Sequence, residues 1–70
     1  MNLQAAIGNR IRTLRSARGW SQEEFADICG IHRSHMGEIE RGEKDVSIST
    51  LQKISKGLDI AISVLLHDVA

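Results

Sequence analysis

Three glycines, at positions 19, 30 and 42, each end a stretch in which apolar residues recur at helical spacing. Glycine often closes a helix because it adopts the left-handed backbone of the final turn without strain. The first stretch covers about residues 3–18, and a single apolar stripe runs along it, formed by Leu3, Ile7, Ile11 and Leu14. The chain is therefore divided into short helices, which need packing against one another to be stable.

The second helix is marked at its start by a capping box, because Ser21 is followed by Glu24 three residues later. Trp20, which precedes the cap, can pack on Phe25 as a hydrophobic staple. We expect the remaining helices of the chain to follow at about residues 22–29, 32–41, 48–57 and 62–67. Two short helices joined by a tight, glycine-containing turn form a helix-turn-helix. The sequence thus predicts one domain over residues 1–70, with a compact all-α fold of five helices.

Composition is typical of a soluble globular protein in a reducing compartment. Charged residues make up 26% and hydrophobic residues 41% of the 70 residues. The single cysteine excludes an internal disulfide framework. The apolar runs are far shorter than the ~20 residues that span a bilayer. We therefore expect a cytoplasmic protein with no membrane partner.

The formal net charge of zero conceals an uneven distribution along the chain. Residues 1–20 carry four arginines and no acid, whereas residues 21–45 carry seven acids against three bases. Composition alone does not indicate a strongly basic surface for nucleic acid. Any contact with phosphate would depend on a few local cations.

Several segments resemble the phage-repressor helix-turn-helix family, which is also called the lambda-repressor-like, Cro or xenobiotic-response-element type. They are QEEFA at 22–26, GIHRS at 30–34, IERG at 39–42 and SISTLQKI at 47–54. The resemblance covers about residues 5–66, and residues 40–59 are also similar to small controller proteins of restriction–modification systems. It implies a dimeric regulator of transcription that binds a specific double-stranded DNA operator with its third helix in the major groove.

The resemblance places one set of residues against base edges: His32, Arg33, Ser34 and Glu38. Arg33 can donate two hydrogen bonds to guanine, and Glu38 can accept one from cytosine. For an isolated helix, a solvated polar face would be the alternative interpretation. The flanking motifs favour base reading because they identify this face as the one that meets DNA.

A second set of residues is expected at phosphates: Gln22, His35, Arg41 and Lys44. Gln22 begins the second helix, where free N–H groups and the helix dipole favour an anion. Arg41 has an alternative role as a cation at the end of its own helix. Arg15 and Glu40 correspond to residues that pair in the family, which implies a partly buried ion pair instead of a DNA contact.

Cys29, His32 and His35 have a spacing that superficially resembles a metal site. Cys29, however, falls on the apolar face of its helix and behaves there as a small hydrophobe. No nucleophile with a base, phosphate-binding loop or pair of acids suggests catalysis. We therefore expect no metal, no cofactor, no small-molecule ligand and no enzymatic activity.

The last segment carries more apolar residues than one face of a short helix can bury. Ile62 and Leu65 are expected to complete the core, which leaves an expected dimer interface of Val64, Leu66 and Val69. A two-fold dimer would bind an approximately palindromic operator. Two alternatives remain open. The chain end can simply fray, or the protein can be an antitoxin-type interaction module whose apolar C-terminus binds a partner protein.

Overall fold

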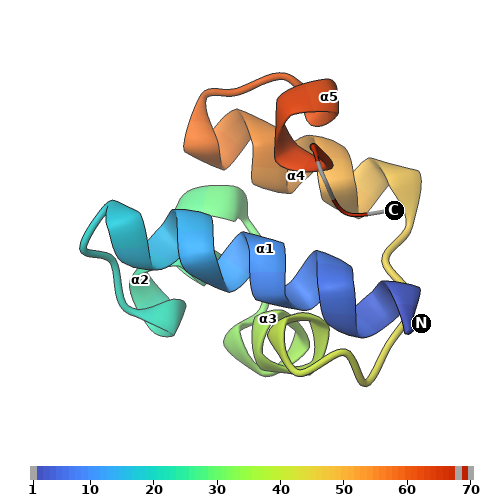
Figure 1. The fold of residues 1–70 in the computed structure, drawn as a ribbon. Coiled ribbons are helices and arrows are strands. Elements are labelled where there is room, and N and C mark those ends of the chain that lie inside the picture. The colour runs from blue at the N-terminus through green and yellow to red at the C-terminus, as the bar shows by residue number, and fades with distance from the viewer. Residues whose placement is uncertain (1, 68, 70) are drawn as a thin grey trace.

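The computed structural model describes residues 2–67 and 69, which form five helices (Figure 1). In chain order they are α1 (Leu3–Ala17), α2 (Gln22–Cys29), α3 (Arg33–Glu40), α4 (Ile48–Leu58) and α5 (Ile62–Leu65). The predicted all-α architecture of five helices is confirmed. Within the described residues, none of these helices combines the length and the apolar character needed to cross a membrane.

The five helices enclose one core. Helix α3 packs on α1 and α2, while α4 packs on α2 and α5. Figure 1 shows α1 running across the molecule, with α3 on one side and α4 and α5 on the other. Each helix supplies at least one fully buried side chain, and the largest of these are Phe25, Ile11, Met36, Ile39, Ile54, Leu58 and Leu65.

The start of α2 has the capping box and staple that the sequence predicts. The Ser21 hydroxyl accepts from the Glu24 N–H at 3.0 Å, and the Glu24 carboxylate accepts from the Ser21 N–H at 2.8 Å. The pKa of the Glu24 carboxyl is lowered, chiefly because the Ser21 backbone N–H donates to it. The Trp20 and Phe25 rings stack with centroids 5.6 Å apart. Local sequence therefore fixes where α2 begins.

A close approach of two backbones at Gly8 sets how α1 crosses α3. A Cβ atom on Gly8 would lie 2.3 Å from the Ile39 carbonyl oxygen and 2.7 Å from that of Glu40. Only glycine fits at such a contact. Arg15 lies seven residues further along α1 and so on the same face of the helix, directed toward α3.

The chain end differs from the prediction in two ways. Helix α5 ends at Leu65. Beyond it, N–H groups donate to carbonyls three residues back instead of four: His67 donates to the Val64 carbonyl and Val69 to that of Leu66. Val69 was expected in a dimer interface, but only 7% of it is exposed. This expectation was wrong because the chain returns to α1, where Val69 lines a surface together with residues 6, 9, 10 and 13.

The burial of Leu66 and of Leu3 also differs from what the sequence predicts. Leu66 is half-buried against the core, so only part of it is available to a partner. Leu3, expected on the buried stripe of the first helix, is 53% exposed. Leu3 lies in the first turn of α1. The segment next to it is the loop around Val46, and not another helix that could bury it. Val64, in contrast, is 49% exposed, as a surplus apolar residue should be.

Candidate nucleic-acid interface

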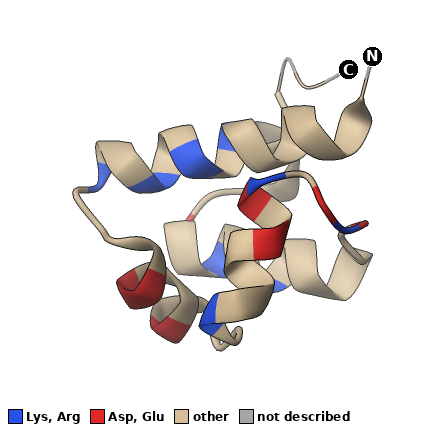
Figure 2. Cartoon of the chain, turned by 90° about the horizontal axis from the view of Figure 1, so that it is seen from below, with Lys and Arg blue, Asp and Glu red and all other residues tan. Residues whose placement is uncertain are grey.

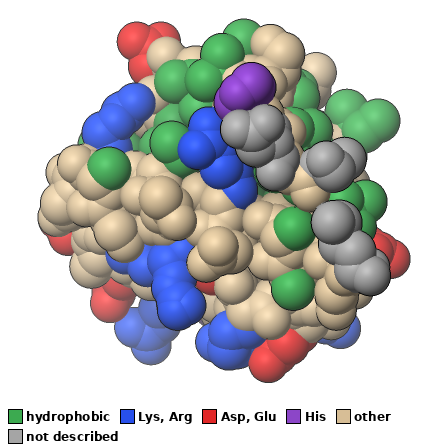
Figure 3. All heavy atoms as spheres, viewed as in Figure 1, with side chains coloured by type: hydrophobic (Ala, Val, Ile, Leu, Met, Phe, Trp, Pro, Cys, Tyr) green, Lys and Arg blue, Asp and Glu red, His purple; other side chains and the backbone are tan. Residues whose placement is uncertain are grey.

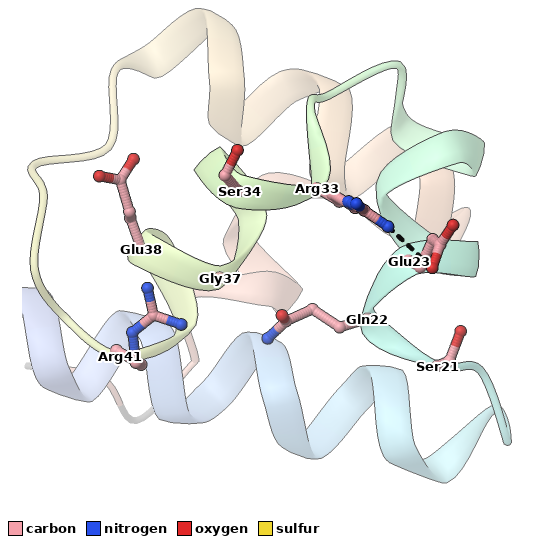
Figure 4. Close-up of a pocket in the computed structure, with 8 residues that line it drawn as sticks. All are labelled: Ser21, Gln22, Glu23, Arg33, Ser34, Gly37, Glu38 and Arg41. Carbon is pink, nitrogen blue, oxygen red and sulfur yellow. Dashed lines mark ion pairs between the residues drawn. The ribbon is translucent and has the colours of Figure 1, made fainter.

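An open groove lies between the start of α2 and the outer face of α3 (Figure 4). Its volume is about 610 Å³, and its lining consists of Ser21, Gln22, Glu23, Arg33, Ser34, Gly37, Glu38 and Arg41. Positions 33, 34, 37, 38 and 41 recur at helical spacing, so they form one face of α3 and of the residue that caps its end. Five residues expected to contact DNA meet here: Gln22, Arg33, Ser34, Glu38 and Arg41. The other three, His32, His35 and Lys44, do not line the groove.

Gly37 forms the middle of the groove and is not among the residues that the sequence predicts at this surface. A Cβ atom at this position would lie 2.9 Å from Arg41 Nη1 and 3.2 Å from Gln22 Oε1. The bare backbone at Gly37 therefore leaves room for two polar side chains that extend over it (Figure 4). The signal was present in the sequence, because Gly37 lies four residues from both Arg33 and Arg41.

Arg15 and Glu40 form a buried ion pair beneath the groove. Arg15 Nε and Nη2 donate to the two carboxylate oxygens of Glu40 at 2.8 and 2.9 Å, and the Glu40 side chain is 3% exposed. The hydrogen bonds with Glu40 raise the pKa of Arg15 above its ordinary value. Gln22 Nε2 donates to the same carboxylate at 3.2 Å. One N–H of the Gln22 amide thus donates to the buried carboxylate of Glu40, and the second N–H is left for another acceptor.

His32 lies one residue before α3 and caps it. Its Nδ1 accepts from the Ser34 N–H at 3.2 Å, and the Ser34 hydroxyl oxygen lies 2.7 Å from the same nitrogen. The predicted helix at 32–41 therefore begins at Arg33, because His32 has the extended backbone of a cap. Only Nε2 of the His32 ring remains for a further contact.

Acidic side chains of the same chain bind the arginines of the groove. Arg33 Nη1 lies 3.5 Å from Glu23 Oε2, the ion pair drawn in Figure 4. Arg41 makes two contacts with Glu43, at 3.0 and 3.1 Å. The hydrogen bonds between them raise the pKa of Arg41 and lower that of Glu43. Among charged residues, Figure 2 shows only acidic ones on α2, whereas basic and acidic residues both occur on α3 and on the loop that follows it.

Arg10 of α1 and Arg18, which caps the end of α1, contact the backbone of other helices instead of lining the groove. Arg10 donates to the Leu65 carbonyl at 3.1 Å and to the Val64 carbonyl at 3.0 Å. Arg18 donates to the Leu58 carbonyl. Carbonyls at the last turn of a helix have no partner within it, so these two arginines cap α5 and α4. The basic character of residues 1–20 is visible in the sequence, but the capping role of these two arginines is not.

Cys29 and the histidines do not assemble into a site. Among the described residues, no three His, Cys, Asp or Glu side chains lie close enough together to hold a metal ion. Cys29 is 7% exposed, and its burial raises the pKa of the thiol to about 11. The thiol is therefore protonated at neutral pH and packs as a small apolar group.

Comparisons with known proteins give consistent matches. A family model described as helix-turn-helix matches residues 11–65. The control protein C.SmaI of Serratia marcescens is 35% identical over 66 residues, which cover 94% of this chain and 79% of that protein. The restriction-modification controller protein C.AhdI from Aeromonas hydrophila has a solved structure with a TM-score of 0.86 and 40% identity, covering 89% of this chain and 94% of that one.

A further match is the structure of a protein bound to DNA. The crystal structure of SinR, a master regulator for biofilm formation, in complex with DNA has a TM-score of 0.80 and 38% identity; it covers 86% of this chain and 97% of that one. The family match at residues 11–65 includes α2, α3 and every residue that lines the groove. The resemblance predicted from the sequence is confirmed, and this chain belongs to the helix-turn-helix family.

Proposed function

We propose that this protein is a transcriptional regulator that binds a specific double-stranded DNA site with α3 in the major groove. The observation that carries the proposal is the groove itself, which combines the start of α2 with the polar face of α3 on one open surface. The DNA complex of SinR and the two control proteins support it. Their names also favour a controller of a restriction–modification system over other kinds of regulator.

In this proposal, residues near the start of α3 read base edges. Arg33 occupies the first position of the helix, where side chains of a recognition helix reach the bases. Its guanidinium group would leave Glu23 and donate two hydrogen bonds to guanine. Ser34 and Glu38 line the same groove one and five positions later and would contact neighbouring bases. His32 would take part only through Nε2.

The proposed phosphate contacts surround this face. The second amide N–H of Gln22 would donate to a phosphate oxygen at the start of α2, where free backbone N–H groups also favour an anion. Arg41, at the end of α3, would bind a phosphate on the other side of Gly37. His35, which is half-buried, and Lys44, which is exposed, would add contacts beyond the groove.

We also propose that two copies associate through α5. Val64 is 49% exposed, and the half-buried Leu66 lies two residues further along. Figure 3 displays hydrophobic side chains on the same part of the molecule, over α4 and α5. A two-fold dimer of this motif places its recognition helices ~34 Å apart, so the operator would be an approximate palindrome with half-site centres ~10 bp apart.

Selection of bound sequences from a random duplex library tests the proposal. A helix-turn-helix regulator enriches one pair of related half-sites, spaced by about one helical turn. Enrichment of such a pair supports both the DNA-binding function and the dimer. Recovery of a single half-site would retain the function and contradict the dimer. Failure to enrich any sequence would contradict the function, and pull-down by a second protein would then favour the antitoxin-type module.

A further inference from the structure

Both hydrogen-bond donors of Ser34 converge on one nitrogen of His32. The Ser34 backbone N–H donates to His32 Nδ1 at 3.2 Å, and the Ser34 hydroxyl oxygen lies 2.7 Å from the same atom. A backbone N–H can only donate, so Nδ1 carries no proton and accepts both hydrogen bonds. The single ring proton of the neutral imidazole is therefore on Nε2.

This contact fixes the direction of the further hydrogen bonds that the two side chains can make. The hydroxyl has one hydrogen, which it donates to Nδ1, so Ser34 Oγ retains only its lone pairs and can only accept. His32 Nε2 holds the ring proton and can only donate. Both residues are exposed, and Ser34 lines the groove, so these atoms are available to a bound molecule (Figure 4).

A serine ordinarily contributes little to the choice of base, because its hydroxyl can donate to some bases and accept from others. Ser34 differs, since its hydroxyl is left to accept only. In the major groove the donors are the amino groups of adenine and cytosine, whereas guanine and thymine present acceptors there. His32 has the opposite requirement, because Nε2 needs an acceptor such as guanine O6 or thymine O4.

We propose that His32 is a positioning residue for Ser34: by accepting the hydrogen bond of its hydroxyl, His32 restricts Ser34 to the amino group of adenine or cytosine. This inference rests on the proposed function and deepens it, because it states which chemical group the first turn of α3 selects. The contact between His32 and Ser34 can persist on DNA, since each side chain keeps one free polar atom. Arg33, in contrast, would have to leave Glu23.

The first test identifies the atom that Ser34 contacts. Ser34→Ala should remove discrimination at one base pair of each selected half-site, measured at about pH 8, where imidazole rings are neutral. A duplex is then made in which hydrogen replaces the amino group of the adenine or cytosine in that pair. This change should weaken wild-type binding about three- to tenfold, the scale of one hydrogen bond, and should not weaken binding by Ser34→Ala.

The second test asks whether His32 sets the preference. Its readout is the ratio of affinities for the operator and for the transition at the same pair, which puts a carbonyl oxygen in place of the amino group. His32→Asn keeps an acceptor and a good helix cap, so it should retain the wild-type ratio of about three- to tenfold. His32→Ala frees the Ser34 hydroxyl to donate to the carbonyl, so its ratio should fall to about one. Loss of the cap lowers both affinities equally and does not alter the ratio.

Three results would overturn the inference. They are wild-type affinity that does not change when the amino group is removed, a ratio for His32→Ala equal to that of the wild type, and a ratio for His32→Asn as low as that expected for His32→Ala. Each requires that an operator has been selected, so none of them counts against DNA binding itself. A selection that enriches no sequence at all would instead remove the proposed function, and this inference with it.

Discussion

Glu40 on α3 receives the guanidinium group of Arg15 on α1 with both carboxylate oxygens, at 2.8 and 2.9 Å. Arg15 also donates to the Trp20 carbonyl at 2.8 Å, just before α2 begins. Gln22, the first residue of α2, donates to Glu40 at 3.2 Å. The buried carboxylate of Glu40 thus connects α1, α3 and the start of α2. It thereby fixes the position of α2 relative to α3, the two helices that form the sides of the groove.

Replacing Glu40 with glutamine should strongly destabilise the fold. Arg15 would remain 14% exposed without a negative partner, and the loss of one member of a buried pair costs about 3–5 kcal/mol. Urea denaturation measures the free energy of unfolding directly. Glu43→Gln, which breaks an exposed pair, is the matched control and should unfold like the wild type. Equal stability of Glu40→Gln and the wild type would contradict the role given to this pair.

Gly37→Ala should weaken DNA binding without destabilising the fold. Alanine is favoured over glycine inside a helix by up to about 1 kcal/mol, so the fold should keep or gain stability. The new Cβ atom would lie 2.9 Å from Arg41 Nη1, which must move, and 3.2 Å from Gln22 Oε1, which must give by a few tenths of an ångström. Operator affinity should therefore fall while the melting temperature does not. Undiminished operator affinity of the Gly37→Ala variant would show that the bare backbone is not required for binding.

Cys29 makes stability sensitive to alkaline pH. Its thiol has a pKa of about 11 in the folded protein, against an ordinary value of 9.0. The unfolded chain therefore releases this proton first, and the free energy of unfolding should fall as pH rises from about 9 to about 11. Urea denaturation across this range measures the effect, and Cys29→Ala is the control for other groups. A variant with the same pH dependence as the wild type would exclude a contribution from the thiol.

Val64→Glu should weaken the dimer and leave the monomer folded, because Val64 is 49% exposed on α5. Burial of apolar surface contributes about 25 cal/mol per Å², and a charge at this position removes that contribution. Sedimentation at micromolar concentration distinguishes monomer from dimer. Leu3→Glu places the same charge on a residue that is 53% exposed at the start of α1, and it should leave association unchanged. A wild-type monomer would contradict the proposed interface.

The elements that sequence predicted well are those determined by neighbouring residues. The capping box of Ser21 and Glu24 and the staple of Trp20 on Phe25 depend on spacings of three to five residues. Gly30 ends α2 with φ 70°, as a helix-closing glycine should. The residues that line the groove were largely predictable for a similar reason, because one face of a helix recurs at fixed spacing.

The features that sequence did not predict depend on how the helices pack. Glu23 and Arg33 are ten residues apart and meet only because α2 and α3 pack at a particular angle. Val69 is apolar at the chain end, and its burial follows from the return of the chain to α1. The capping of α5 by Arg10 joins residues more than fifty positions apart. No local pattern encodes such contacts.

The claim that α3 reads base edges is tested most directly with Arg33. Arg33→Ala should be titrated against the operator and against every single-base variant of one half-site. Because Arg33 would bind one guanine, its loss should cost about 1–3 kcal/mol and remove discrimination at one position while preserving it elsewhere. Gln22→Ala, which removes a proposed phosphate contact, should weaken all variants about equally. A uniform loss for Arg33→Ala, with discrimination intact at every position, would contradict the account.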